Sequence, residues 1–207
     1  MDNIESQAGI TNALEWAISR KPMSGESVCG DNYLVTFSEH RVLVAVTDGL
    51  GHGEKAAESS QRAINELRNY SNETLLRLIR QSHEILLGSR GVTMSLALFD
   101  SENHTMSWTS VGNVDGILYR SNEDATPAHE SLVLRGGVVG YRLPALQASM
   151  FMVEPGDLLL FATDGVRHDL FPTIDVHTPP QKIVEYGNKN FFKETDDALI
   201  LAARYLG

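Results

Sequence analysis

The sequence predicts an α+β fold in which two antiparallel β-sheets pack face to face and helices cover them on the outside. Three observations indicate this class. Short strand-like stretches follow one another with turn residues between them, as hairpins require. Helical periodicity is grouped in a few places instead of alternating with strands, which argues against a doubly wound parallel sheet. Several strands are apolar on consecutive residues, so both of their faces need cover.

Three strands are predicted before the first helix. Ala13–Arg20 alternates loosely between apolar and polar residues, and a stretch rich in turn residues follows it. Tyr33–Ser38 and Val42–Val46 form two further strands joined by the polar tip Glu-His-Arg. The last of the three is apolar on every residue, which predicts burial on both faces.

Two helices are predicted next, and we expect them to pack as a pair. Small and apolar residues recur every three or four positions in Ala56–Leu67, which gives the first helix one buried face. The same spacing in Leu75–Leu86 predicts the second helix, and Ser71 or Asn72 is placed to cap its start.

The rest of the chain is mostly strand. A tight turn is predicted at Glu154–Asp157. A short helix is predicted from Thr178-Pro179-Pro180, with proline in its first turn and Gly187 placed to end it. The predicted strands are Val92–Phe99, Thr105–Val111, Gly116–Tyr119, Ser131–Leu134, Ser149–Val153, Leu158–Ala162 and Ala198–Ala203.

The composition fits one globular domain over residues 1–207. Apolar residues make up 42% of the chain and charged residues 21%, which allows a core and is not the composition of a disordered chain. The net charge of −10, from 17 basic and 27 acidic side chains, argues against a nucleic acid or an anionic membrane as the main partner. We expect a monomer.

Nothing in the sequence predicts export or membrane insertion. The single cysteine, Cys29, cannot form an internal disulfide, which suits a reducing compartment. Residues 1–9 lack the basic and apolar parts of a signal peptide. No apolar run approaches the roughly 18 residues of a membrane span. The expected location is therefore the cytoplasm.

Four acidic positions stand at the ends of predicted strands. Asp31 precedes one strand, and the pair Asp196–Asp197 precedes the last one. Asp48 and Asp164 each end an apolar run within the same three residues, Thr-Asp-Gly. Because the end of one antiparallel strand lies beside the start of the next, we expect these positions to converge on one edge of the sheets. A lone Asp-Gly pair is usually only a turn, so the inference depends on the whole ordered set.

Clustered carboxylates point to a divalent metal. Like charges in one place raise each other's pKa unless a cation lies between them. Mg²⁺ and Mn²⁺ prefer oxygen ligands and need few protein carboxylates. Gly49 lets the backbone approach closely enough for its carbonyl to be a ligand as well. The sequence has no Cys/His zinc pattern and no P-loop.

These motifs resemble those of the metal-dependent PPM protein serine/threonine phosphatases, in particular the bacterial branch that dephosphorylates STAS-domain regulatory proteins. The strongest matches are VAVTDGLGHG (44–53) and PGDLLLFATDGV (155–166). Leu199 stands where the family often has Thr, and the resemblance covers the chain from Ser24 to Leu201. The other motifs that match, in order, are SGESVCGD (24–31), GVTMSLALFD (91–100), SVGNVDG (110–116) and TDDALIL (195–201).

The resemblance implies a four-layer αββα sandwich, two antiparallel sheets flanked by helix pairs, with a centre of two Mn²⁺ or Mg²⁺ ions at one end. Asp48 would bridge the two ions. Asp164 and Asp196 would hold one ion, and Asp31 with the Gly49 carbonyl would hold the other.

The resemblance also implies the activity. A metal-activated water would hydrolyse phosphoserine or phosphothreonine, and the substrates would be phosphorylated STAS-domain proteins of a stressosome, of the RsbS and RsbR types. Asp197 is a further metal candidate that could exchange roles with Asp196. His52 lies in the glycine-rich segment Gly49–Gly53, called the glycine loop below. It is the acid–base candidate, although it could instead only pack on that loop.

Other interpretations of the same residues stay open. The chain could be an inactive member that binds a phosphoprotein without hydrolysing it, although the complete aspartate set argues against this. It could also act on a small phosphate ester. Thr93 and Asn113 could support the metal ligands or only a turn and the core. Eukaryotic relatives grip phosphate with an arginine upstream of the first motif, and the corresponding place near Glu26 holds none.

Overall fold

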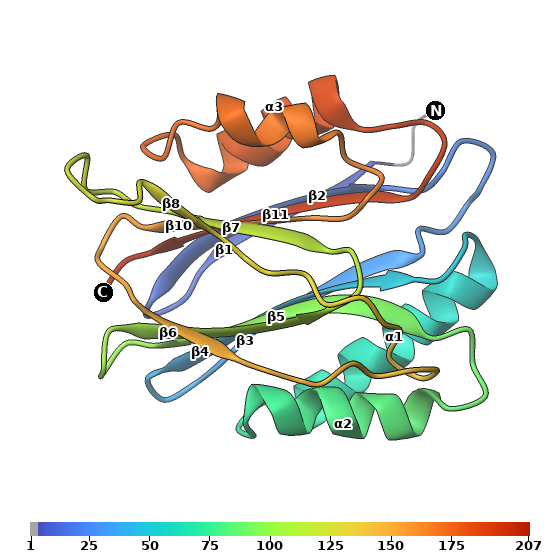
Figure 1. Ribbon diagram of the computed structural model, residues 1–207. Helices are drawn as coiled ribbons and strands as arrows, with labels where there is room; N and C mark the ends of the chain where they lie inside the picture. Colours follow the sequence, from blue (N-terminus) through green and yellow to red (C-terminus); the bar gives the residue numbers. More distant parts are fainter. Residues whose placement is uncertain (1–3) are drawn as a thin grey trace.

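The structure, a computed structural model that describes residues 4–207, has two antiparallel sheets stacked between helices (Figure 1). The strands of the six-stranded sheet are, in the order in which they lie side by side, β1 (Glu5–Ile10), β2 (Leu14–Lys21), β11 (Ala198–Tyr205), β10 (Leu158–Ala162), β7 (Asp115–Tyr119) and β8 (His129–Ser131). The five-stranded sheet holds, likewise in spatial order, β3 (Asp31–Ser38), β4 (Arg41–Gly49), β5 (Val92–Asp100), β6 (Thr105–Val111) and β9 (Ser149–Met152).

Helices cover the outer face of each sheet (Figure 1). The predicted pair, α1 (Glu54–Asn69) and α2 (Leu75–Leu86), packs on the five-stranded sheet. The helix α3 (Pro180–Phe191) and the short 3-10 helix η1 (His168–Thr173) pack on the six-stranded sheet. The predicted α+β sandwich of four layers is therefore confirmed.

The pattern of β4 explains why its sequence is apolar on consecutive residues. Val44 and Val46 pack between the two sheets, where they meet Leu201 of β11. Leu43 and Ala45 point the other way, into the apolar layer between this sheet and helices α1 and α2. Because successive side chains of a strand face opposite sides, both layers are filled by one uninterrupted apolar run.

Two local predictions were wrong. The strand expected at Ser131–Leu134 lies earlier, at His129–Ser131, because only this stretch pairs with β7. The N-cap of α2 is Thr74 instead of Ser71 or Asn72, and its side chain makes no capping hydrogen bond.

Gly187 does not end α3, and this prediction was also wrong. The helix continues through Gly187 to Phe191. A Cβ built at Gly187 would overlap Ile200 Cδ1 of β11, so any larger residue here would displace the end of that side chain where α3 packs on the sheet. A glycine that ends a helix and one that permits close packing look alike in a sequence.

The strand β1 was not predicted, because Glu5–Ile10 is mostly polar and lies at the edge of its sheet. Residues 1–9 were predicted not to be a signal peptide. Residues 1–3 of this stretch lie outside the described residues, and the strand β1 begins at Glu5. None of the helices between residues 4 and 207 combines the length and the apolarity needed to cross a bilayer.

Candidate metal centre

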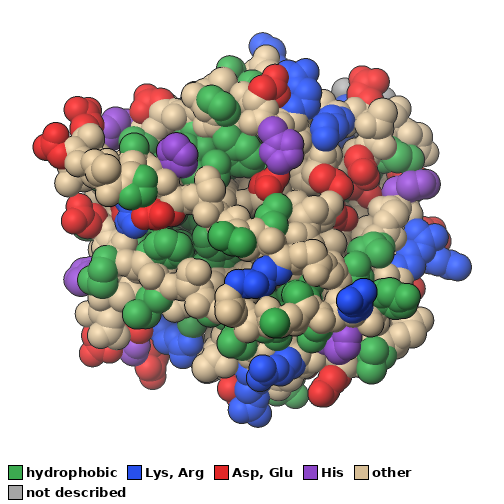
Figure 2. Space-filling model, viewed as in Figure 1, with side chains coloured by type: hydrophobic (Ala, Val, Ile, Leu, Met, Phe, Trp, Pro, Cys, Tyr) green, Lys and Arg blue, Asp and Glu red, His purple; other side chains and the backbone are tan. Residues whose placement is uncertain are grey.

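Four of the predicted acidic positions meet at one end of the sandwich. Asp31 and Asp48 are direct partners across the β3–β4 ladder. Asp164 follows β10 and Asp196 precedes β11, and these two strands are antiparallel neighbours in the other sheet. A pocket of about 480 Å³ is lined by Asp48, Asp164 and Asp196. In Figure 2, acidic side chains gather between the two sheets in the right half of the view.

Asp31 is the most deeply buried member of this group, at 1% exposure. It does not line the pocket but adjoins Asp48 in the ladder. Burial, and then the charge of Asp48, raises the pKa of Asp31 well above its usual range. The Thr163 hydroxyl, from the other sheet, donates a hydrogen bond of 2.7 Å to Asp31 Oδ2 and partly offsets this rise.

The two aspartates of the Thr-Asp-Gly segments repel each other across the pocket. Burial, followed by the charges of Asp164 and Asp196, raises the pKa of Asp48 to about 7. Burial and then Asp196 also raise the pKa of Asp164, while Lys193 and Asn113 act in the opposite direction. The fold therefore concentrates negative charge here at a cost, which a bound cation would remove.

A short chain of hydrogen bonds joins the two aspartates. Asn113 Nδ2 donates to Asp164 Oδ2 at 2.7 Å. The Thr93 hydroxyl donates to Asn113 Oδ1 at 2.7 Å and lies 3.4 Å from Asp48 Oδ2. Because both Thr93 and Asn113 line the pocket, they orient the carboxylates that face it.

The glycines after the two aspartates are needed for close backbone contacts. A Cβ at Gly49 would collide with the backbone carbonyl of Ala56, at the start of α1. A Cβ at Gly165 would collide with the backbone carbonyl of Asp197. Each Asp-Gly pair therefore lets a second segment approach its aspartate directly.

Asp197 differs from its neighbour Asp196. It is buried and does not line the pocket. Its two carboxylate oxygens accept the backbone N–H groups of Met23, at 2.8 Å, and of Gly30, at 2.9 Å. We therefore expect Asp197 to hold the loop that leads into Asp31, and Asp196 to face any bound ion.

His52 lines the pocket and is paired with a residue that the sequence analysis did not assign to the site. Its Nδ1 lies 2.6 Å from Glu26 Oε1. A carboxylate at this position holds the ring in one orientation and leaves Nε2 as the ring atom that can exchange a proton. Glu26 lies where eukaryotic relatives have the arginine that grips phosphate. This correspondence is the sequence feature that could have indicated a role for Glu26 in the site.

The pocket also has a wall that no motif predicted. Gly136, Gly137 and Val138 belong to the long connection between β8 and β9 and line the pocket opposite the glycine loop. This connection is held in place by a bridge between Val139 and Val92 of β5. In the sequence, the Gly136-Gly137 pair, within a stretch that has no regular period, is the feature that could have indicated this wall.

The residues fit a hard divalent cation. All of the predicted ligand atoms are oxygens, which Mg²⁺ and Mn²⁺ prefer. Two neighbouring cations have other partners. Lys193 Nζ donates at 2.6 Å to the backbone carbonyl of Asp164, and Arg20 pairs with Glu5 at 2.6 Å. Because the pKa of Asp164 stays raised in spite of Lys193, a metal ion would supply positive charge that the carboxylates still lack.

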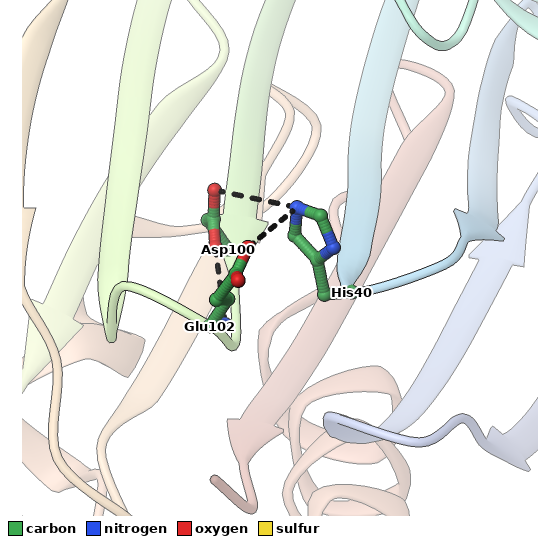
Figure 3. Close-up of side chains that lie close together, drawn as sticks. All are labelled: His40, Asp100 and Glu102. Carbon is green, nitrogen blue, oxygen red and sulfur yellow. Dashed lines mark hydrogen bonds and ion pairs between the residues drawn. The ribbon is translucent and has the colours of Figure 1, made fainter.

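A second group of possible ligands lies at the other end of the β3–β4–β5 ladder (Figure 3). Within residues 4–207, His40, Asp100 and Glu102 form the one set of three such side chains whose ligand atoms all lie within 4.8 Å of one another. Asp100 pairs with Arg41, whereas Asp48 lies at the opposite end of β4. Asp100 Oδ1 accepts the backbone N–H groups of Glu102 and Asn103, so its carboxylate is part of a surface turn. The pocket carboxylates are spread more widely, as their mutual repulsion favours.

Comparison with known proteins gives the family. The profile of the family described as Stage II sporulation protein E (SpoIIE) matches residues 38–179. The chain belongs to this family of PP2C-type phosphatases, the PPM class that its motifs resemble. Among curated proteins, the phosphoserine phosphatase RsbX of Bacillus subtilis (strain 168) is 30% identical over 162 residues, which is 78% of this chain and 77% of RsbX. The predicted enzyme class, a phosphatase, is confirmed.

Solved structures give the same fold. A structure of RsbX in complex with magnesium has a TM-score of 0.85 at 22% identity and covers 97% of this chain and 100% of its own. A structure from work on the bacterial stressosome, described as a modular system adapted to control secondary messenger signalling, has a TM-score of 0.83 at 26% identity. That match covers 92% of this chain and 99% of the other.

Proposed function

We propose that the chain is a metal-dependent protein serine/threonine phosphatase whose substrates are phosphorylated STAS-domain proteins of a stressosome, of the RsbS and RsbR types. The observation that carries this proposal is the convergence of carboxylates from separate segments on one pocket. The identity with RsbX, a phosphoserine phosphatase, and the likeness to a stressosome structure support the substrate class.

The proposed ligands are those that the family resemblance implies. Asp48 would be shared by two ions. Asp164, which follows β10, and Asp196, which precedes the neighbouring strand β11, would hold one of them. Asp31 and the Gly49 carbonyl, beside Asp48 in the other sheet, would hold the second. The magnesium bound by RsbX supports Mg²⁺ or Mn²⁺ as the metal.

The chemistry divides between the metal and the chain. Two bound divalent ions supply a water of lowered pKa and neutralise charge on the phosphoryl group. Asn113 keeps the Asp164 carboxylate directed into the pocket. Glu26 accepts the Nδ1–H of His52, so that Nε2 can give a proton to the serine or threonine oxygen as the P–O bond breaks. The backbone N–H groups of the glycine loop, which begins α1, favour an anion nearby.

The test is dephosphorylation of a phosphorylated STAS-domain protein by the purified chain with added Mn²⁺. We expect the substrate to lose its phosphate, which is measured by phosphate-specific gel mobility or by mass spectrometry. We expect no loss when a chelator is present or when the Asp48→Asn variant replaces the wild type. The variant serves as a matched control because it keeps the shape of the side chain.

Two results would contradict the proposal. Unchanged phosphorylation over hours, with tight binding of the phosphoprotein, would favour the inactive binding module instead. Faster hydrolysis of nucleotides or sugar phosphates than of phosphoproteins would make the chain a small-ester phosphatase.

A further inference from the structure

We propose that Arg90 binds the phosphoryl group of the substrate at the rim of the metal centre, an inference that rests on the proposed function. Arg90 Nη1 lies 3.5 Å from the carbonyl oxygens of both Leu50 and His52. A Cβ built at Gly51 would lie 2.8 Å from the same nitrogen. Leu50, Gly51 and His52 all line the pocket that Asp48 enters. The guanidinium therefore lies directly against the pocket's glycine loop.

The backbone that carries Arg90 is fixed to this loop. Leu50 N–H donates to the carbonyl of Gly91 at 3.2 Å, which joins the α2–β5 connection to the β4–α1 loop. Gly91 N–H donates to Ser89 Oγ at 3.1 Å, and Gly91 has a φ of +80°, which favours glycine. The backbone next to Arg90 is thus held against the loop that follows Asp48 and β4.

Arg90 keeps donors free for a ligand. Its two contacts with carbonyls are long and both use Nη1, whereas a guanidinium has five N–H groups. Within residues 4–207, other arginines near the sheets form ion pairs with carboxylates, as Arg20 does with Glu5 and Arg120 with Asp157. Arg90 is in none of these ion pairs. Its side chain is exposed, so an incoming substrate can reach it.

The chemistry of the substrate calls for such a group. A phosphorylated side chain carries close to two negative charges, and the pocket that receives it is lined by carboxylates. A guanidinium presents its N–H groups in a planar fork that matches two phosphate oxygens. Glu26 cannot do this, because it is negative and pairs with His52. Lys193 is already bound to the Asp164 carbonyl.

The experiment compares Arg90→Ala and Arg90→Lys with Arg80→Ala, which removes an exposed arginine within α2, away from the connection that contacts Leu50 and His52. Binding of inorganic phosphate to the Mg²⁺-loaded protein is measured by calorimetry, and kcat and KM are measured on a phosphoserine peptide. We expect Arg90→Ala to weaken phosphate binding and raise KM, each by about 10- to 100-fold, as the loss of charge-assisted hydrogen bonds predicts. Arg90→Lys should fall between the wild type and Arg90→Ala, and Arg80→Ala should match the wild type.

Two outcomes overturn the inference in distinct ways. Unchanged phosphate binding and KM in Arg90→Ala would show that the guanidinium does not touch the phosphate. Weaker binding of Mg²⁺ itself in Arg90→Ala, measured without phosphate, would make Arg90 a brace for the glycine loop. If the wild type hydrolyses no phosphopeptide, the proposed function fails, while the calorimetry still tests Arg90.

Discussion

Thr47–Gly49 and Thr163–Gly165 have the same three residues and end strands in different sheets. Their aspartates line one pocket, and their glycines avoid collisions with neighbouring backbone. Their threonines differ. The Thr47 hydroxyl lies 3.4 Å from the carbonyl of Asn32, on the next strand of its own sheet. The Thr163 hydroxyl donates at 2.7 Å to Asp31, in the opposite sheet. The same motif thus closes a ladder in one place and joins two sheets in the other.

The aspartates differ in their surroundings as well. Asp48 has Asp31 beside it in the ladder, and the Thr93 hydroxyl, which donates to Asn113, lies 3.4 Å from Asp48 Oδ2. Asp164 receives a bond of 2.7 Å from Asn113. The lesson is that Asp48 stands at the centre of the acidic group with little support from the protein, whereas Asp164 stands at its edge and is held by a neutral donor. This difference between the two aspartates can be tested by substitution.

The largest effect is expected from replacing the aspartates themselves. Asp48→Asn should lower kcat by about a thousandfold or more, because a charge that stabilises a bound metal is worth several kcal/mol. Asp164→Asn should lose less activity, since in the proposed centre Asp164 would hold one ion and Asp48 two. Initial rates at saturating Mn²⁺ test this, with far-ultraviolet circular dichroism to show that both variants fold. Equal losses would remove the proposed difference between the two aspartates.

The support of Asp164 can be removed separately. Asn113→Leu keeps the volume and deletes the donor, so Mn²⁺ should bind about 10- to 100-fold more weakly, as is common when a residue that orients a ligand is lost. Thr93→Val should have a smaller effect, because its contact with Asp48 is long. Calorimetric titration with Mn²⁺ measures both. An unchanged affinity in Asn113→Leu would mean that Asp164 needs no orientation.

The threonines give a matched pair for stability. Thr163→Val leaves the buried Asp31 carboxylate without its donor and should lower the free energy of unfolding by about 2 kcal/mol. Thr47→Val removes only a weak contact and should cost less than about 1 kcal/mol. Urea denaturation in the presence of a chelator measures both. A larger loss in Thr47→Val would reverse the roles assigned to the two segments.

A further effect concerns the pH dependence of the metal-free protein. The pKa of Asp48 is about 7 in the folded chain, against 3.8 ordinarily. Between these values the folded state binds a proton that the unfolded state has released, so this group makes stability fall as the pH rises from 3.8 to about 7. Relative to the wild type in chelator, Asp48→Asn should therefore become more stable across that window. A difference that is constant with pH would contradict the raised pKa.

The parts of the site that could be predicted from the sequence are those carried by strands. A buried strand that ends in Asp-Gly fixes where its aspartate emerges, and antiparallel pairing brings Asp48 beside Asp31 and the end of β10 at Asp164 near the start of β11 at Asp196. The choice between Asp196 and Asp197 did not follow. Adjacent residues point to opposite sides of a chain entering a strand, and nothing in the sequence says which side faces the pocket.

The parts that could not be predicted depend on loops. The contact between the side chains of His52 and Glu26 joins residues 26 apart in the chain, and that between the Arg90 side chain and the His52 carbonyl joins residues 38 apart. No periodicity links such positions, because loop conformation is set by the elements that the loops connect. The wall at Gly136–Val138 likewise depends on how the β8–β9 connection crosses between the sheets.

The place of β11 in the fold has a consequence for protein synthesis. This strand is inserted between β2 and β10 in the six-stranded sheet, yet it is translated after both. The bonds from Met23 and Gly30 to Asp197 span 174 and 167 residues. A growing chain that has not yet released residues 196–205 from the ribosome lacks both an acidic member of the pocket and the tether of the loop before Asp31. If the proposed carboxylates form the centre, phosphatase activity would require residues 196–205 to have emerged, and contacts of such long range form late and slowly.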